Sequence, residues 1–140
     1  MKNKKIKKQV FFIEAKPYRQ ECIVVVNGQF SDAVRCLKKL NNKHSKEILE
    51  YIEKEKEHYP DDYVIGGGDA YLYTKLPRGY VMLLSSNDSW VQMSVDVYHE
   101  CLHLTFRILR NAGLEVSEET EEAFTYLQAD LASQILRKIF

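Results

Sequence analysis

Two pairs of short β-rich segments stand out in the pattern of apolar and polar residues. Residues 9–16 and 22–27 are rich in β-branched and aromatic side chains, and Pro17 lies in the polar stretch between them. Residues 69–75 and 80–85 form a second pair, separated by a turn sequence. Runs of this length bounded by turn residues are typical of β-strands, so we expect two strands and then a β-hairpin.

Apolar residues elsewhere recur every three or four positions, which is the spacing of an amphipathic helix. This spacing predicts helices over 31–40, 45–58 and 90–112, and a last helix that Ser117 caps. The expected element order is β-β-α-α-β-β-α-α. It predicts an α+β domain in which an antiparallel or mixed sheet packs against the helix of residues 90–112 and the C-terminal helix.

Length and charge predict one domain with a basic leading segment. At 140 residues the chain fits a single domain, which we place over residues 9–140 after a lysine-rich tail of residues 1–8. Residues 1–60 hold 14 Lys or Arg and 8 Asp or Glu, whereas residues 61–140 hold 6 and 12. The formal net charge is nevertheless zero. A nucleic-acid partner is not expected, because such binding needs a basic excess.

The chain also shows no sequence feature of export or membrane insertion. The apolar run near its start covers only residues 10–13, and a secretory signal needs roughly 7–15 apolar residues. No stretch reaches the roughly 20 apolar residues of a membrane span. The three cysteines, an odd and widely spaced set, fit a reducing compartment. We therefore expect a cytoplasmic protein without a membrane partner.

The candidate chemistry lies in the helical segment of residues 90–112, at His99-Glu100-Cys101-Leu102-His103. Two histidines four residues apart lie on one side of a helix, so both imidazoles can bind one tetrahedral zinc ion. Zinc lowers the pKa of a bound water towards about 7, and the adjacent Glu100 can take its proton as general base. This His-Glu-x-x-His pattern indicates a zincin-type metallopeptidase. Two histidines packed at a helix surface are the alternative interpretation.

A tetrahedral site needs a third protein ligand, and several residues could supply it. The metzincin pattern would require Gly and His where this chain has Phe106 and Leu109, so that class is excluded. His44 and His58 lie in a charged helical region and are more typical of surface histidines. Carboxylates downstream of the motif are better candidates. These candidates are Glu118, Glu121, Glu122 and Asp130.

The segment from Val97 to His103, followed about twenty residues later by Glu122-Ala123-Phe124-Thr125-Tyr126, resembles small metallopeptidase-like proteins of phages and prophages. The order of motif and downstream glutamate is similar to that of gluzincins, in a minimal form. The resemblance covers roughly residues 90–135. It implies that His99, His103 and Glu122 hold zinc and that Glu100 is the base.

The resemblance also implies a function. We expect a zinc-dependent hydrolase in which water, activated by zinc and Glu100, attacks the carbonyl of a peptide or protein substrate. A substrate strand would pair with a sheet edge, for which the hairpin containing residues 80–85 is the candidate. Tyr126, one turn after Glu122 on the same side, could orient Glu122 or stabilise an oxyanion. Packing of its ring in the core is the alternative, since aromatic residues at helical spacing usually pack. Cys101 and Leu102 are expected to pack in the interior. The alternative is a non-catalytic binding protein on a zincin scaffold, acting in phage assembly or host interference.

Overall fold

A computed structural model describes residues 5–58, 71–76, 79–85 and 89–140, and it gives only the backbone of residues 55–58 and 71–76. Its centre is a four-stranded mixed sheet with the strand order β1-β2-β4-β3. The strands are β1 (Gln9–Ala15), β2 (Gln20–Val26), β3 (Tyr71–Leu76) and β4 (Gly79–Leu84). β1 and β2 are antiparallel, as are β3 and β4, whereas β2 and β4 are parallel.

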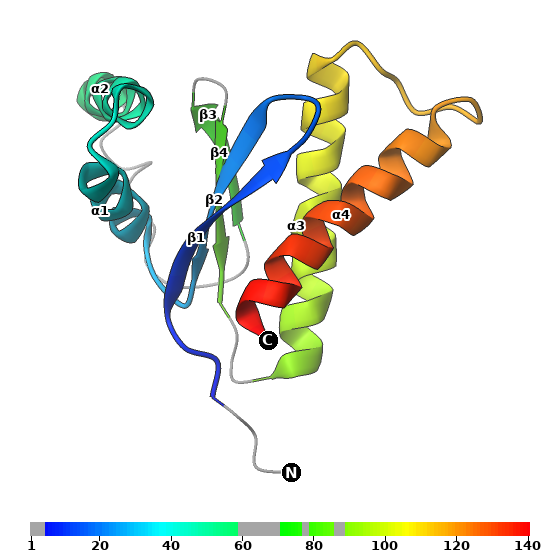
Figure 1. The fold of residues 1–140 in the computed structure, drawn as a ribbon, viewed down its shortest axis with the longest axis horizontal. Helices are drawn as coiled ribbons and strands as arrows, with labels where there is room; N and C mark the ends of the chain where they lie inside the picture. The colour runs from blue at the N-terminus through cyan, green and yellow to red at the C-terminus, as the bar shows by residue number, and fades with distance from the viewer. Residues whose placement is uncertain (1–4, 59–70, 77–78, 86–88) are drawn as a thin grey trace.

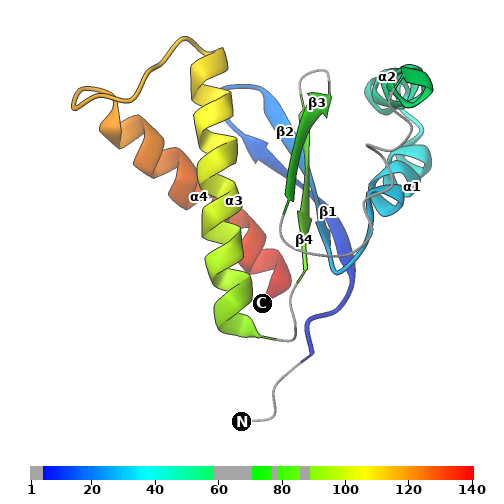
Figure 2. The same cartoon turned by 180° about the vertical axis from the view of Figure 1, so that it is seen from behind.

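Helices cover both faces of this sheet (Figures 1 and 2). One face carries α1 (Phe30–Leu40) and α2 (Lys43–His58), and the other carries α3 (Trp90–Asn111) and α4 (Glu121–Ile139). The domain is therefore a three-layer α/β/α arrangement. The parallel pairing of β2 with β4 follows from this arrangement, because the chain crosses the sheet through α1 and α2 between the two strands.

The central strands bury both of their faces, in two separate apolar clusters. Cys22, Val24 and Val26 face the cluster under α3 and α4. Ile23 and Val25 alternate with them and face the cluster under α1 and α2. Because side chains alternate along a strand, a continuous apolar run such as that of β2 is what a strand buried on both faces requires. This double burial fixes the sheet firmly beneath α3.

The segment before β1 lies against the domain from Ile6 onwards. The Ile6 side chain is buried in the cluster under α3 and α4, and its carbonyl accepts a hydrogen bond from Asn27 Nδ2 at 3.0 Å. Lys8 forms an ion pair with Asp32 of α1 at 2.8 Å. Residues 6 and 8 therefore contribute contacts to the fold, ahead of the first strand.

The structure confirms the predicted α+β class with its mixed sheet, although the sheet lies between two helical layers. The last helix begins later than predicted: Ser117 lies in a turn closed by Thr120, and α4 starts at Glu121. The reason is that Ser117 and Thr120 bond each other's backbone amides instead of capping a helix at Ser117. Over the part of the chain described, no helix is both long enough and apolar enough to cross a membrane.

Candidate metal centre

α3 carries the His-Glu-x-x-His motif and is held in place by its buried side. Ser89 caps the helix, its hydroxyl accepting a hydrogen bond from the Gln92 amide at 3.2 Å. The residues that fix the helix on the sheet are spaced by three or four positions and are almost fully buried: Met93, Val97, Cys101, Leu104 and Ile108. This stripe fixes the rotation of α3 about its axis. As a result, His99 and His103 lie on an exposed flank of the helix.

The two histidines point at a common position. Their Nε2 atoms are 3.2 Å apart, and their ring planes are inclined by 74°. Two nitrogens bound to one tetrahedral zinc at about 2.05 Å would lie roughly 3.3 Å apart. The pair thus matches one edge of such a tetrahedron. The same distance also suits a hydrogen bond between a protonated and an unprotonated ring nitrogen.

Glu100 lies beside the pair but on the buried side of the flank. The residue is only 5% exposed. This burial raises the pKa of Glu100 above its ordinary value, while the nearby imidazoles of His103 and His99 act in the opposite direction. Burial is the larger effect, and it makes the Glu100 carboxylate a stronger base than an exposed glutamate.

Cys101 is the one potential soft ligand inside the motif, and it faces away from the histidines. The residue is completely buried in the cluster under α3 and α4, as predicted. Burial raises the pKa of its thiol to about 12. Because only the thiolate is a strong zinc ligand, Cys101 acts as a core residue.

α4 runs antiparallel to α3. Two antiparallel helices joined at residues 113–116 are expected to place residue 125 or 126 level with His103, and the contacts of α4 agree with this register. Phe106 packs against Phe124 with ring centroids 5.3 Å apart, and Gln128 Nε2 donates to the Tyr98 carbonyl at 3.2 Å. At the other end, the Trp90 and Phe140 rings stack at 3.9 Å. His103 is therefore level with the turn of α4 that follows Glu122.

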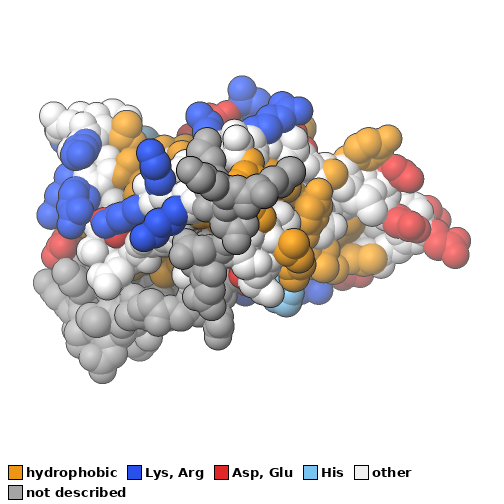
Figure 3. Space-filling model, turned by 90° about the horizontal axis from the view of Figure 1, so that it is seen from below, with side chains coloured by type: hydrophobic (Ala, Val, Ile, Leu, Met, Phe, Trp, Pro, Cys, Tyr) orange, Lys and Arg blue, Asp and Glu red, His pale blue; other side chains and the backbone are white. Residues whose placement is uncertain are grey.

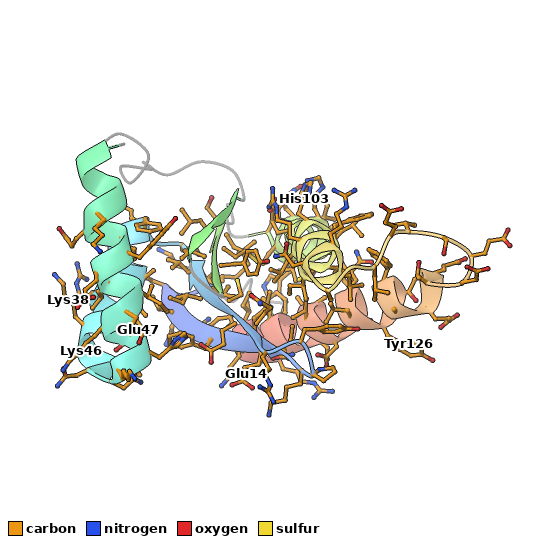
Figure 4. All side chains as sticks on the ribbon, turned by 90° about the horizontal axis from the view of Figure 1, so that it is seen from above. Glu14, Lys38, Lys46, Glu47, His103 and Tyr126 are labelled. Carbon is orange, nitrogen blue, oxygen red and sulfur yellow. The ribbon has the colours of Figure 1, made fainter. Side chains whose placement is uncertain are left out.

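Glu122 and Tyr126 lie at a similar height to His103 along the two helices, but they do not contact it, because the histidines do not face α4. Glu122 is exposed on α4, and Tyr126 is 72% exposed. Figure 4 shows His103 and Tyr126 pointing to opposite sides of the molecule. Within the described ranges, no group of three His, Cys, Asp or Glu side chains could hold one metal ion. The roles assigned to Glu122 and Tyr126 stay predictions.

The other candidate ligands lie elsewhere or outside the described side chains. His44 forms an ion pair with Glu21 at 3.4 Å on the opposite helical layer. Asp130 accepts a hydrogen bond from Gln134 at 2.8 Å. Glu118 and Glu121 are exposed near the start of α4. The side chain of His58 is among those that the structure does not describe.

Two features near the histidines differ from the sequence interpretation. β4, which contains residues 80–84, lies inside the sheet, so the edge strand of the hairpin is β3.

Leu102 was expected to pack in the interior but is 40% exposed. It belongs to an exposed apolar row on α3 whose spacing of four, three and four residues is visible in the sequence. The row consists of Val91, Val95, Tyr98 and Leu102.

Comparison of the chain with protein-family models, with curated proteins and with solved structures found no match.

Proposed function

We propose that this protein is a zinc-dependent, metallopeptidase-like hydrolase that cleaves a peptide or amide bond. The observation that carries the proposal is the 3.2 Å separation of His99 Nε2 and His103 Nε2, with the buried Glu100 beside them. A pair of surface histidines needs neither that convergence nor a buried carboxyl. A metal-dependent hydrolase of this motif needs convergent ligands for the metal and uses a nearby carboxylate as the general base.

The imidazole and carboxylate groups of these residues are donor types that bind zinc in proteins. His99 and His103 would hold it through Nε2, and Glu122 is proposed as the third ligand on the resemblance to phage metallopeptidase-like proteins. Bound zinc would lower the pKa of water and polarise the substrate carbonyl. A third ligand from α4 would require α3 and α4 to turn relative to each other, because Glu122 is exposed and the histidines do not face α4.

Glu100 is the proposed general base. Its carboxylate would accept a proton from the attacking water and later pass that proton to the leaving amine. Burial suits this role, because a base with a raised pKa binds the proton more strongly. The fixed position of α3 on the sheet also holds the carboxylate at a constant place relative to the two imidazoles.

An extended peptide is the proposed substrate. β3 is an edge strand of the described sheet and contacts α3, the helix that carries the motif. An edge strand has backbone N–H and C=O groups that can pair with a peptide in the manner of an added strand. Such pairing recognises the backbone of the substrate through hydrogen bonds, so it fits cleavage of an extended peptide or an unfolded protein segment.

The test is cleavage of a peptide library by the zinc-loaded protein, with Glu100→Gln as the matched variant. Gln keeps the shape of Glu100 but cannot accept the proton. We expect the parent to create new peptide termini in mass spectrometry and the variant to lose about 10²- to 10⁴-fold in rate while keeping its zinc. A zinc-loaded parent that cuts no peptide would contradict the proposal and favour the non-catalytic binding protein.

A further inference from the structure

The outer side of α3 carries a row of apolar side chains that the fold leaves exposed. Val91 is 76% exposed, Val95 56%, Tyr98 48% and Leu102 40%. We call these four residues the α3 stripe. Figure 3 shows hydrophobic side chains gathered over α3 and α4 beside a histidine. Exposed apolar residues scattered singly are ordinary, but an aligned row on one helix marks a contact surface.

The spacing of the α3 stripe indicates that its partner is another helix. Successive members are four, three and four residues apart, which is the a/d pattern of a two-helix seam. Two residues flank this seam, Gln92 after Val91 and His99 after Tyr98, and neither belongs to the Lys, Arg, Asp or Glu types. Two copies of α3 could therefore meet along the stripe without like charges facing each other.

The exposed area agrees with a small interface between two copies. The four side chains expose roughly 400 Å² of mainly apolar surface, judged from their exposed fractions. Homodimer interfaces are about 65% apolar, so this area corresponds to roughly 600 Å² per copy once polar neighbours are included. That places a pairing through the stripe at the lower end of specific interfaces, about 1,200 Å² in total.

The charges at the two ends of α3 favour one orientation. The connection from α3 to α4 and the first turn of α4 form an acidic end with five exposed glutamates: Glu115, Glu118, Glu119, Glu121 and Glu122. The other end of α3 is basic, because Lys5 and Lys7 line a cavity of about 330 Å³ together with Trp90 and Phe140. Lys8 also lines this cavity, but its charge is paired with Asp32. The two ends lie at the top and bottom of Figure 1.

We propose that the α3 stripe pairs with the α3 stripe of a second copy of this chain, with the two helices antiparallel. Parallel pairing would place ten carboxylates together. Antiparallel pairing instead directs each acidic end towards the lysines of the other copy. Val95 of one copy then lies opposite Tyr98 of the other, and Val91 lies opposite Leu102.

The first test is sedimentation velocity from about 1 to 500 µM protein. The small interface leads us to expect a concentration-dependent dimer in the micromolar range. Leu102→Glu places a charge in each half of the seam and should weaken the dimer at least tenfold. Leu40→Glu is the matched control, because Leu40 is 47% exposed on the opposite helical layer. It should dimerise like the parent.

Circular dichroism of both variants verifies that neither change unfolds the chain. A parent that stays monomeric at every concentration overturns the proposal. Equal weakening by Leu102→Glu and Leu40→Glu also overturns it, because the contact would then not run through the stripe.

The orientation is tested by disulfide cross-linking in a Cys36→Ser background. We expect a mixture of Val95→Cys and Tyr98→Cys chains, one of them tagged, to give mainly mixed cross-linked pairs. If cross-links instead joined only chains that carry the same substitution, the helices would be parallel. That result would overturn the antiparallel arrangement.

Discussion

The Nε2 atoms of His99 and His103 lie 3.2 Å apart on the exposed flank of α3, close to the edge length of a zinc tetrahedron. The convergence arises from helix geometry, because residues four apart differ by only about 40° around the axis. The buried stripe of α3 fixes the direction in which both rings point. The pair is therefore the best-defined part of the candidate site.

We predict that the chain binds about one zinc ion per molecule through this pair. Replacing both histidines by Ala should abolish stoichiometric binding, because a single carboxylate holds zinc only weakly in water. The measurement is elemental zinc analysis after dialysis, supported by calorimetric titration. His44→Ala serves as the control, since His44 lies on the other helical layer beside Glu21. Stoichiometric zinc in the double variant would show that the metal binds elsewhere.

Glu122 is the predicted third ligand, and its contribution can be separated from general acidity. Glu122→Ala should weaken zinc binding by more than about 100-fold, because loss of a ligand costs more than the roughly 10- to 100-fold loss seen when only a hydrogen-bond partner of a ligand is removed. Glu118→Ala removes an equal charge from the same acidic end and should have little effect. Equal zinc affinity in Glu122→Ala and the parent would move the third ligand to another residue.

The sequence predicted the elements well because their signals are local. The continuous apolar runs of β1 and β2 follow from apolar contacts on both faces of these strands. The helical spacing around Val97 and Leu104 follows from burial of one side of α3. The register of α3 against α4 was also predictable from an expected connection at residues 113–116, although the observed connection is longer and covers residues 112–120. Packing of Phe106 on Phe124 confirms this register.

Rotation of the helices about their axes was the part that local signals could not settle. The length of the connection places Glu122 near the height of His103, but it does not decide which way either side chain faces. The predicted cap at Ser117 was wrong for a similar reason. Thr120 occupies the cap position of α4, because several polar residues near the helix start compete for the same amides.

Glu100 should make the fold less stable as the pH rises. Burial raises its pKa in the folded protein, so the unfolded chain releases this proton at lower pH than the folded protein does. Ionisation therefore favours unfolding once the pH exceeds the ordinary value of 4.5. In the metal-free protein, we expect Glu100→Gln to unfold at a higher urea concentration than the parent at pH 7. The two proteins should be similar at pH 4.

Glu122→Gln is the control for that comparison. Glu122 is exposed on α4, so the same chemical change should leave the difference between pH 4 and pH 7 almost unaltered. A Glu100→Gln protein that is less stable than the parent at pH 7 would show that the Glu100 carboxylate forms stabilising contacts. Burial would then not be the dominant effect on its pKa.

Asp32 should show the opposite pH dependence. Its carboxylate is 6% exposed and accepts a hydrogen bond from the Gln29 amide at 2.8 Å at the start of α1. It also forms ion pairs with Lys8 at 2.8 Å and Arg35 at 3.2 Å. The contact with Lys8 is the main reason that the pKa of Asp32 is lowered. Both cationic partners are more than half exposed, so solvent screens part of the attraction.

We predict that Asp32→Asn costs about 1.5–2 kcal/mol of unfolding free energy at pH 7, at the low end of the range for hydrogen bonds to charged groups because solvent screens the exposed partners. Because the folded pKa lies below the ordinary value of 3.8, this contribution is fully present above that pH. It is lost as the pH falls through the folded pKa, where parent and variant should converge. Urea unfolding between about pH 2.5 and 7 measures the unfolding free energies of the parent and of Asp32→Asn. Arg35→Gln removes only the more exposed partner and should cost less than Asp32→Asn. A pH-independent difference between the parent and Asp32→Asn would show that the shape of the side chain, and not its charge, stabilises the start of α1.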